Sequence, residues 1–171
     1  MFKRKILFLA VVLLIISTVN SCKVSYSFTG ASISPDVKTF SVYYFPNRAR
    51  LVNPMLSQTF TESLREKLQR QTSLNELAEG GDLIFEGQIT GYDVRPMSIQ
   101  KEDMAALNRL TVTITVKYTN NKNTDQNIER SFSAFEDFDS TSSLSDVEDG
   151  LVPEIIEKLT EDIFNATLAN W

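Results

Sequence analysis

The stretch "RLTVTITVKYT", residues 109–119, alternates strictly between two kinds of side chain. The apolar set is Leu110, Val112, Ile114, Val116 and Tyr118, and the polar set is Thr111, Thr113, Thr115, Lys117 and Thr119. Successive side chains of a strand point to opposite faces, so this pattern predicts a strand with one buried face and one solvated face. Half-buried strands of this kind are typical of antiparallel sheets.

Three further strands are predicted on either side of this stretch. They are "VKTFSVYYF" (37–45), "DLIFEGQITGYDVRP" (82–96) and, after the polar turn "NNKNTDQN", "IERSFSAFEDFDS" (128–140). All three are rich in β-branched or aromatic residues. Gly87 and Gly91 are four residues apart, which places them on one face of a regular strand, so we expect a bend or a close approach by a helix there.

An amphipathic helix of about 18 residues is predicted after Asn53-Pro54. An asparagine can cap the free N–H groups of a helix start, and proline is tolerated in the first turn. The apolar stripe repeats every four residues and consists of Leu56, Phe60, Leu64 and Leu68.

A second amphipathic helix is predicted near the C-terminus. Its apolar face consists of Leu151, Val152, Ile155, Ile156, Leu159, Ile163 and Phe164. Ser145 and Glu148 fit a capping box. Pro153 conflicts with a straight helix from Ser145, so we expect the helix either to begin near Leu151 or to kink at the proline.

The resulting order is β-α-β-β-β-α. Two helices and an alternating sheet each have one apolar surface, and a two-layer arrangement covers all of them. We therefore expect an α+β sandwich with both helices on one face of a four-stranded, mostly antiparallel sheet.

The first 22 residues, "MFKRKILFLAVVLLIISTVNSC", begin with basic residues, continue with an apolar run from Ile6 to Ile16 and end in small polar residues. This order is that of a secretory signal, and the run is shorter than the ~20 residues that a membrane-spanning helix needs. The alternatives are an uncleaved anchor or a buried helix. Removal of residues 1–21 would leave 14 basic and 22 acidic residues, a net charge of −8.

The only cysteine, Cys22, follows this signal directly. "Val19-Asn20-Ser21-Cys22" resembles the bacterial lipobox, with a mild departure at Asn20. The resemblance implies a covalent lipid on Cys22 and cleavage before it. By the same resemblance, the absence of an aspartate after Cys22 implies an outer-membrane location, and the absence of an acidic run implies that the protein faces the periplasm. The alternative is a free thiol in an ordinary secreted protein. Residues 22–36 are then a lipidated tether and residues 37–171 the folded domain.

Composition argues against several functional classes. An acidic body does not favour nucleic-acid binding, which needs basic surface. The chain has no histidine, which removes the commonest general base and most zinc sites. The acidic runs "FEDFD" (135–139) and "DVED" (146–149) lack the alternating spacing of a calcium loop and are typical of solvated turns. We therefore expect no enzyme activity, no metal and no cofactor other than the lipid.

The chain resembles the LPS-assembly lipoproteins of the LptE family. The stretches that carry the resemblance are "SYSFTGASISPDVKTFSVYYFPNRARLVNP", "LSQTFTESLREKL" and "GDLIFEGQITGY". The resemblance implies a lipoprotein that plugs the outer-membrane β-barrel LptD, assists the assembly of that barrel and helps deliver lipopolysaccharide to the outer leaflet. The alternatives are a pilot or scaffold for another envelope complex and, less favoured by the small interior, a soluble-ligand carrier.

Candidate contact residues follow from the pattern and from this resemblance. The polar face with Thr111, Thr113, Thr115 and Lys117 could contact the barrel, or could simply be a solvated strand face. Arg48, Arg50 and Arg95 lie near predicted strand ends, where loops could gather them around phosphates of lipopolysaccharide. Their alternative is unrelated solvated arginines. Tyr43, Tyr44 and Phe45 could meet acyl chains or the barrel wall, with core packing favoured for Tyr44.

Overall fold

The computed structural model describes residues 33–51, 53–97 and 106–169. The predicted signal peptide and Cys22 lie outside these residues. The elements, in chain order, are β1 (Thr39–Val42), α2 (Leu56–Gln71), β2 (Asn75–Glu76), β3 (Leu83–Met97), β4 (Leu107–Asn120), the 3-10 helix η1 (Thr124–Gln126), β5 (Ile128–Asp139) and α3 (Leu144–Thr167). No helix within the described ranges is long and apolar enough to cross a membrane.

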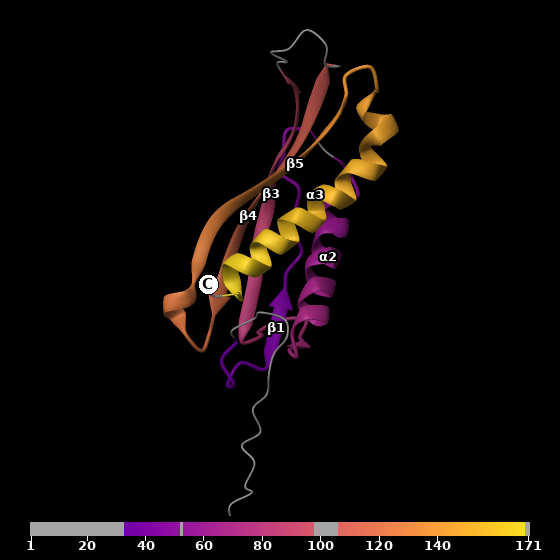
Figure 1. The fold of residues 1–171 in the computed structure, drawn as a ribbon. Coiled ribbons are helices and arrows are strands. Elements are labelled where there is room, and N and C mark those ends of the chain that lie inside the picture. Colours follow the sequence, from indigo (N-terminus) through magenta and orange to yellow (C-terminus); the bar gives the residue numbers. More distant parts are fainter. Residues whose placement is uncertain (1–32, 52, 98–105, 170–171) are drawn as a thin grey trace, which may run out of the picture.

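The predicted α+β sandwich is confirmed, with α2 and α3 together on one side of the sheet (Figure 1). The strand order is β2-β1-β3-β4-β5, so the described sheet has five strands where four were expected. The extra strand, β2, forms because the chain after α2 returns to the sheet and pairs two residues with β1. β1 is parallel to both β2 and β3, and the remaining pairs are antiparallel.

The alternation along β4 is confirmed. Leu110, Val112, Ile114 and Val116 are fully buried, whereas none of the threonines between them is buried. β4 lies between β3 and β5, and Ile114 pairs in register with Ile89 on one side and Phe132 on the other. The helices cover only the apolar face of this central strand.

The two glycines of β3 lie on opposite faces of the sheet. The register of β3 and β4 shifts between Ile89 and Gly91, so that Gly87 faces Val116 on the helix side and Gly91 faces Thr113 on the other. A β-bulge adds one residue and reverses the side to which later residues point. The expectation that the glycines share a face was therefore wrong.

The close neighbour of Gly87 is also different from the expected helix. A Cβ atom at this position would overlap the carbonyl oxygen of Thr115 and come within 2.8 Å of Cε1 of Phe45. The Phe45 ring, in turn, meets the Phe60 ring of α2 edge to face, with centroids 5.0 Å apart. The glycine makes room for an aromatic ring that joins the sheet to α2.

α2 begins at Leu56 with Met55 as its N-cap, so the expected place of Pro54 at the first helical position was wrong, whereas Asn53 does bond free N–H groups at this end. Asn53 Oδ1 accepts hydrogen bonds from the backbone N–H groups of Met55 (2.8 Å) and Leu56 (3.0 Å). These bonds satisfy donors that have no partner inside the helix. The four residues of the predicted stripe are fully buried.

α3 begins at Leu144 and continues through Pro153 to Thr167, earlier than the alternative start near Leu151. The capping box was wrong: Ser143 is the N-cap, and in the described structure no side-chain hydrogen bond caps the helix. Glu148 instead accepts hydrogen bonds from the Tyr92 hydroxyl and from Asn53 Nδ2 (2.7 Å). Its carboxylate thereby joins β3, the start of α2 and the start of α3.

Candidate functional site

The face of the sheet that points away from the helices, here called the outer face, is polar over three strands. The residues in register on this face include Glu86, Gln88, Gly91, Asp93 and Arg95 of β3; Arg109, Thr111, Thr113, Thr115 and Lys117 of β4; and Glu129, Ser131, Ser133, Phe135 and Asp137 of β5. None of these residues is buried. The outer face is therefore a continuous accessible surface.

The centre of the outer face carries hydroxyl groups that bond across strands. Thr113 Oγ1 lies 3.1 Å from Ser133 Oγ, and Thr115 Oγ1 lies 2.9 Å from Ser131 Oγ. A hydroxyl can donate one hydrogen bond and accept others, so each pair keeps capacity for a further partner. This strip is uncharged and can bind another polar surface without the desolvation of an ion.

Ion pairs close the two ends of this strip. Arg109 binds Asp137 with two hydrogen bonds, of 2.7 Å from Nε and 2.9 Å from a terminal nitrogen, and its guanidinium lies 3.5 Å from the Phe135 ring centroid. At the other end Lys117 Nζ donates to Glu86 Oε1 at 2.6 Å. The Arg109 hydrogen bonds lower the pKa of Asp137, and the Glu86 hydrogen bond raises the pKa of Lys117. Both shifts favour the charged forms of Asp137 and Lys117.

The structure places only some of the predicted contact residues together. Thr111, Thr113, Thr115 and Lys117 share the outer face with Arg95, which faces Arg109 across β3 and β4. Contact of any of them with a barrel stays a prediction.

Arg48 and Arg50 lie elsewhere, in the segment between β1 and α2. The Arg48 N–H donates to the carbonyl of Ile89 at 2.8 Å, so this arginine, which follows β1 in the chain, lies beside the middle of β3. Arg95 lies six residues further along β3, roughly 20 Å in an extended strand. The backbone therefore does not gather Arg48 and Arg95, and lipopolysaccharide contact at the three arginines stays a prediction.

The aromatic run after β1 is also distributed differently from the expectation. Tyr44 is 60% exposed, whereas Phe45 is fully buried. The Phe45 N–H donates to the buried Thr61 hydroxyl of α2, so this backbone turns inward at Phe45. The favoured core role of Tyr44 was wrong, and Tyr44 is available at the surface.

Residues 109 and 128–139 contribute more to the outer face than was predicted. The missed residues are Arg109, Ser131, Ser133, Phe135 and Asp137. Their alternation was visible, since Ser131 and Ser133 flank Phe132 in the sequence. The register that brings them beside the threonines depends on how η1 and its turn connect β4 to β5.

The acidic run 135–139 has structural partners. Glu136 pairs with Lys158, Asp137 with Arg109, and Asp139 accepts from the Thr141 hydroxyl and N–H, which lowers the pKa of Asp139. Across the described residues no group of three or more His, Cys, Asp or Glu side chains is arranged to hold a metal ion.

Comparisons with known proteins identify a family. The family model described as LptE, lipopolysaccharide-assembly, matches residues 37–167. No curated protein matches the chain. The hypothetical protein CT253 from Chlamydia trachomatis is 9% identical over 78% of this chain and 99% of its own, with a TM-score of 0.54. A minor lipoprotein from Acinetobacter baumannii is 14% identical over 74% and 89%, with a TM-score of 0.49. At these identities the likeness to CT253 concerns the fold alone.

Proposed function

The chain belongs to the LptE family of lipopolysaccharide-assembly proteins, and we propose that it is a lipid-anchored lipoprotein that plugs an LptD-like outer-membrane β-barrel. In this role it assists assembly of the barrel and helps deliver lipopolysaccharide to the outer leaflet. The observation that carries the proposal is the outer face, a polar sheet surface that the helices leave uncovered. A plug needs such a surface because the lumen of a large barrel is polar.

The charge arrangement of the outer face supports this contact. Burial of an unpaired ion costs several kcal/mol, whereas charges that already have partners lose less on burial. Arg109 and Lys117 both have carboxylate partners, and the hydroxyl pairs lie between them. The hydroxyl strip and the two ion pairs that flank it can thus meet a polar wall without burial of an unpaired ion.

The anchor is proposed at Cys22, with residues 22–36 as the tether and the periplasmic side of the outer membrane as the location. One acyl chain binds a membrane marginally, whereas several chains, at ~0.8 kcal/mol per buried CH₂, hold firmly. Radiolabelled palmitate should label the wild-type protein and not Cys22→Ala. Equal labelling of both proteins would refute the anchor.

The barrel partnership is tested by capture of a C-terminally tagged full chain from gently solubilised outer membranes. Thr113→Arg adds a charge at the centre of the outer face, and Gln58→Arg adds the same charge on the exposed side of α2. We expect Thr113→Arg to reduce captured barrel at least tenfold and Gln58→Arg to leave it unchanged, with similar urea midpoints for both variants.

Two results would contradict the proposal. One is capture of no large barrel by the wild-type chain. The other is equal capture by both variants, which would mean that the outer face makes no contact. Capture of a different envelope complex would favour the pilot or scaffold role instead.

A further inference from the structure

β5 forms one edge of the sheet and presents backbone groups outside the ladder. It is twelve residues long, pairs with β4 without interruption from Ile128 to Asp139, and contains no proline. Natural edge strands are usually shielded by short length, proline, bulges or central charges. The centre of β5, Ser131 to Phe135, has none of these devices.

One contact shows which backbone groups of β5 point away from β4. The Phe135 carbonyl oxygen accepts a hydrogen bond of 3.5 Å from Lys158 Nζ of α3. Hydrogen-bonding direction alternates along an antiparallel strand, so the N–H and C=O groups of Ser131 and Ser133 point to the same free side. The edge therefore offers donors and acceptors at alternate residues.

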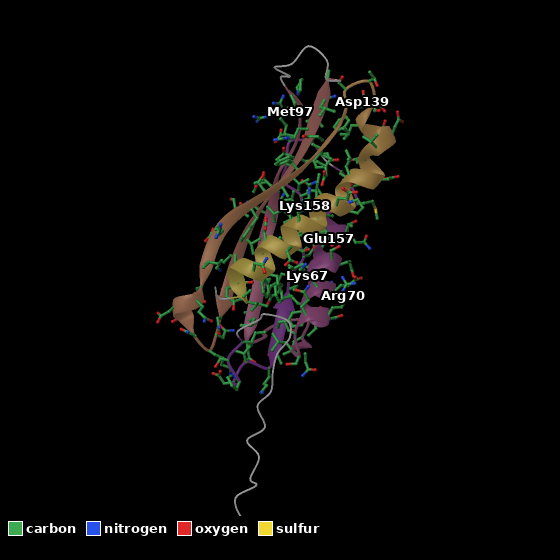
Figure 2. All side chains as sticks on the ribbon, in the orientation of Figure 1. Lys67, Arg70, Met97, Asp139, Glu157 and Lys158 are labelled. Carbon is green, nitrogen blue, oxygen red and sulfur yellow. The ribbon has the colours of Figure 1, made fainter. Side chains whose placement is uncertain are left out.

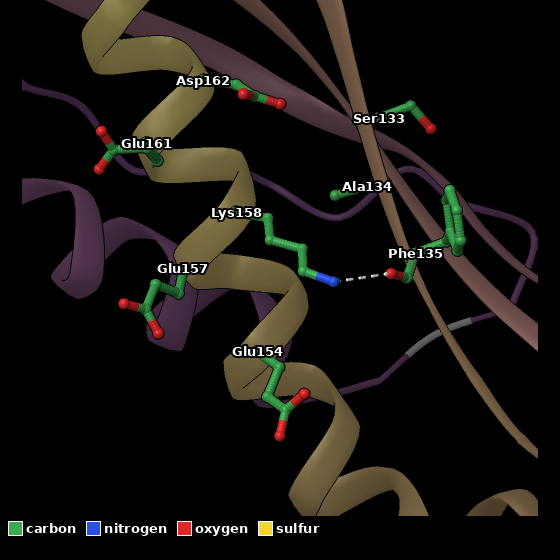
Figure 3. Close-up of a pocket in the computed structure, with 8 residues that line it drawn as sticks. All are labelled: Ser133, Ala134, Phe135, Glu154, Glu157, Lys158, Glu161 and Asp162. Carbon is green, nitrogen blue, oxygen red and sulfur yellow. Dashed lines mark hydrogen bonds between the residues drawn. The ribbon is translucent and has the colours of Figure 1, made fainter.

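An open trough lies between this edge and α3 (Figure 3). Its volume is about 850 Å³, and Ser133, Ala134 and Phe135 form its strand side. On α3, Glu154, Lys158 and Asp162 follow one another at four-residue spacing, which places them on one flank of the helix. Figure 3 shows Lys158 pointing to Phe135 from this flank. Glu157 and Glu161 also line the trough, from the other side of the helix.

The trough has uncompensated negative charge. Lys158 pairs with Glu136, and Glu161 pairs with Lys67 of α2. Within the described part of the chain, no ion pair joins Glu154 or Asp162 to a cation. A segment that lies along β5 would therefore meet a carboxylate on each side of Lys158.

We propose that the edge of β5 binds an extended segment of a partner protein as a sixth strand, with two basic side chains facing α3. The spacing defines the segment: eight helical residues from Glu154 to Asp162 span ~12 Å, and residues four apart in a strand are ~13 Å apart. The segment carries its basic residues at positions i and i+4 and an apolar or small residue at i+2, opposite Ala134. A backbone N–H of the segment donates to the Phe135 carbonyl in place of Lys158 Nζ, in the main-chain pairing that strand-addition complexes use.

The test attaches a strand to the full chain. A flexible Gly/Ser linker of about 15 residues after Trp171 has a root-mean-square span of roughly 21 Å. Leu168 borders the same small cleft as Gln126, at the turn before β5, so the linker reaches the centre of the strand. The added tail has the sequence Thr-Lys-Thr-Val-Thr-Lys, which places the two lysines four residues apart with valine between them. Linkage gives an effective concentration in the millimolar range, so weak pairing becomes measurable.

Hydrogen exchange is the readout. We expect the tail to slow exchange of the Ser131, Ser133 and Phe135 amides at least tenfold, compared with a chain that carries the linker alone. Ser133→Pro removes an edge donor without removing a bond to β4 and should abolish protection at Ser131 and Phe135. Ser133→Ala keeps the donor and should leave protection unchanged.

An exchange of charge between α3 and the tail distinguishes the proposed strand pairing from non-specific electrostatic attraction. Asp162→Lys should reduce protection at least tenfold. A tail with glutamate in place of only the lysine that faces position 162 should restore protection in that variant alone. Asp149→Lys, at an exposed position of α3 outside the trough, should change nothing. Absence of protection with the original tail, protection that survives Ser133→Pro, or equal losses in Asp162→Lys and Asp149→Lys would each overturn the proposal. None of these results depends on the barrel partnership.

Discussion

The two faces of β4 differ completely although their residues alternate along one strand. Ile114 has 0% of its surface exposed and lies beneath the helices, while Thr113 and Thr115 on either side of it meet solvent and bond to serines of β5. Full burial of an aliphatic side chain contributes roughly 1.5–3 kcal/mol, whereas exposed cross-strand pairs contribute roughly 0.2–1 kcal/mol. The inner face therefore holds the fold together and leaves the outer face free to change with function.

The largest expected effect tests this difference directly. Ile114→Ala removes a fully buried side chain that packs between β3, β5 and the helices, and should lower the free energy of unfolding by about 3 kcal/mol. Thr113→Ala, its neighbour on the outer face, should cost less than about 1 kcal/mol. Urea unfolding followed by circular dichroism measures the free energy of unfolding of both variants. Equal losses would show that the inner face does not contribute more to stability than the outer face.

The second effect concerns the inner of the two glycines. Gly87→Ala places a methyl group against the Thr115 carbonyl and the Phe45 ring, where the backbone cannot yield cheaply. Overpacking of this kind costs roughly 1–3 kcal/mol, and we expect about 2 kcal/mol by urea unfolding. A Gly87→Ala protein as stable as wild type would mean that the Phe45 ring can leave its site.

Gly91→Ala provides the matching substitution on the other side of the bulge, at the glycine of the outer face. Its Cβ would lie 3.0 Å from Cβ of Thr113, a much longer contact than that of Gly87 with the Thr115 carbonyl oxygen at 2.1 Å. We expect a change of less than about 1 kcal/mol in the free energy of unfolding, since a local shift of a few tenths of an ångström relieves the contact. A loss as large as that of Gly87→Ala would contradict the placement of the glycines on opposite faces.

The smallest effect is electrostatic and depends on pH. The Arg109 hydrogen bonds lower the folded-state pKa of Asp137, so this pair stabilises the protein above the unfolded pKa of about 3.9. Its contribution is lost as pH falls through the lower folded-state pKa. Asp137→Asn should therefore lower the urea midpoint slightly at pH 7 and progressively less below pH 4. A difference that does not change with pH would exclude the pair as its source.

Periodic features of the fold could be predicted from the sequence because one buried face imposes its period on each element. The stripe of α2, the apolar face of α3 and the alternation of β4 all followed from this rule. Periodicity did not predict three other features: the bulge between Ile89 and Gly91, the short β2 and the partner of Glu148. These features arise from neighbours distant in sequence, which local periodicity does not record.

The candidate site divides in the same way. The outer-face threonines could be predicted because their positions are fixed by alternation, but Ser131 and Ser133 required the register of β4 and β5. The placement of Arg48 beside Ile89 required the path of the chain after β1. Side chains on one strand are predictable, whereas sets drawn from several strands depend on pairing.

The sequence by itself determined that this chain forms two amphipathic helices and a half-covered sheet, since alternating burial leaves a direct pattern in the order of residues. Only the tertiary structure decided that β5 ends the sheet, that the trough beside it faces Glu154 and Asp162, and that Gly91 changed sides. The physical reason is that strand order and register depend on the free energy of contacts between distant segments, which no single segment carries.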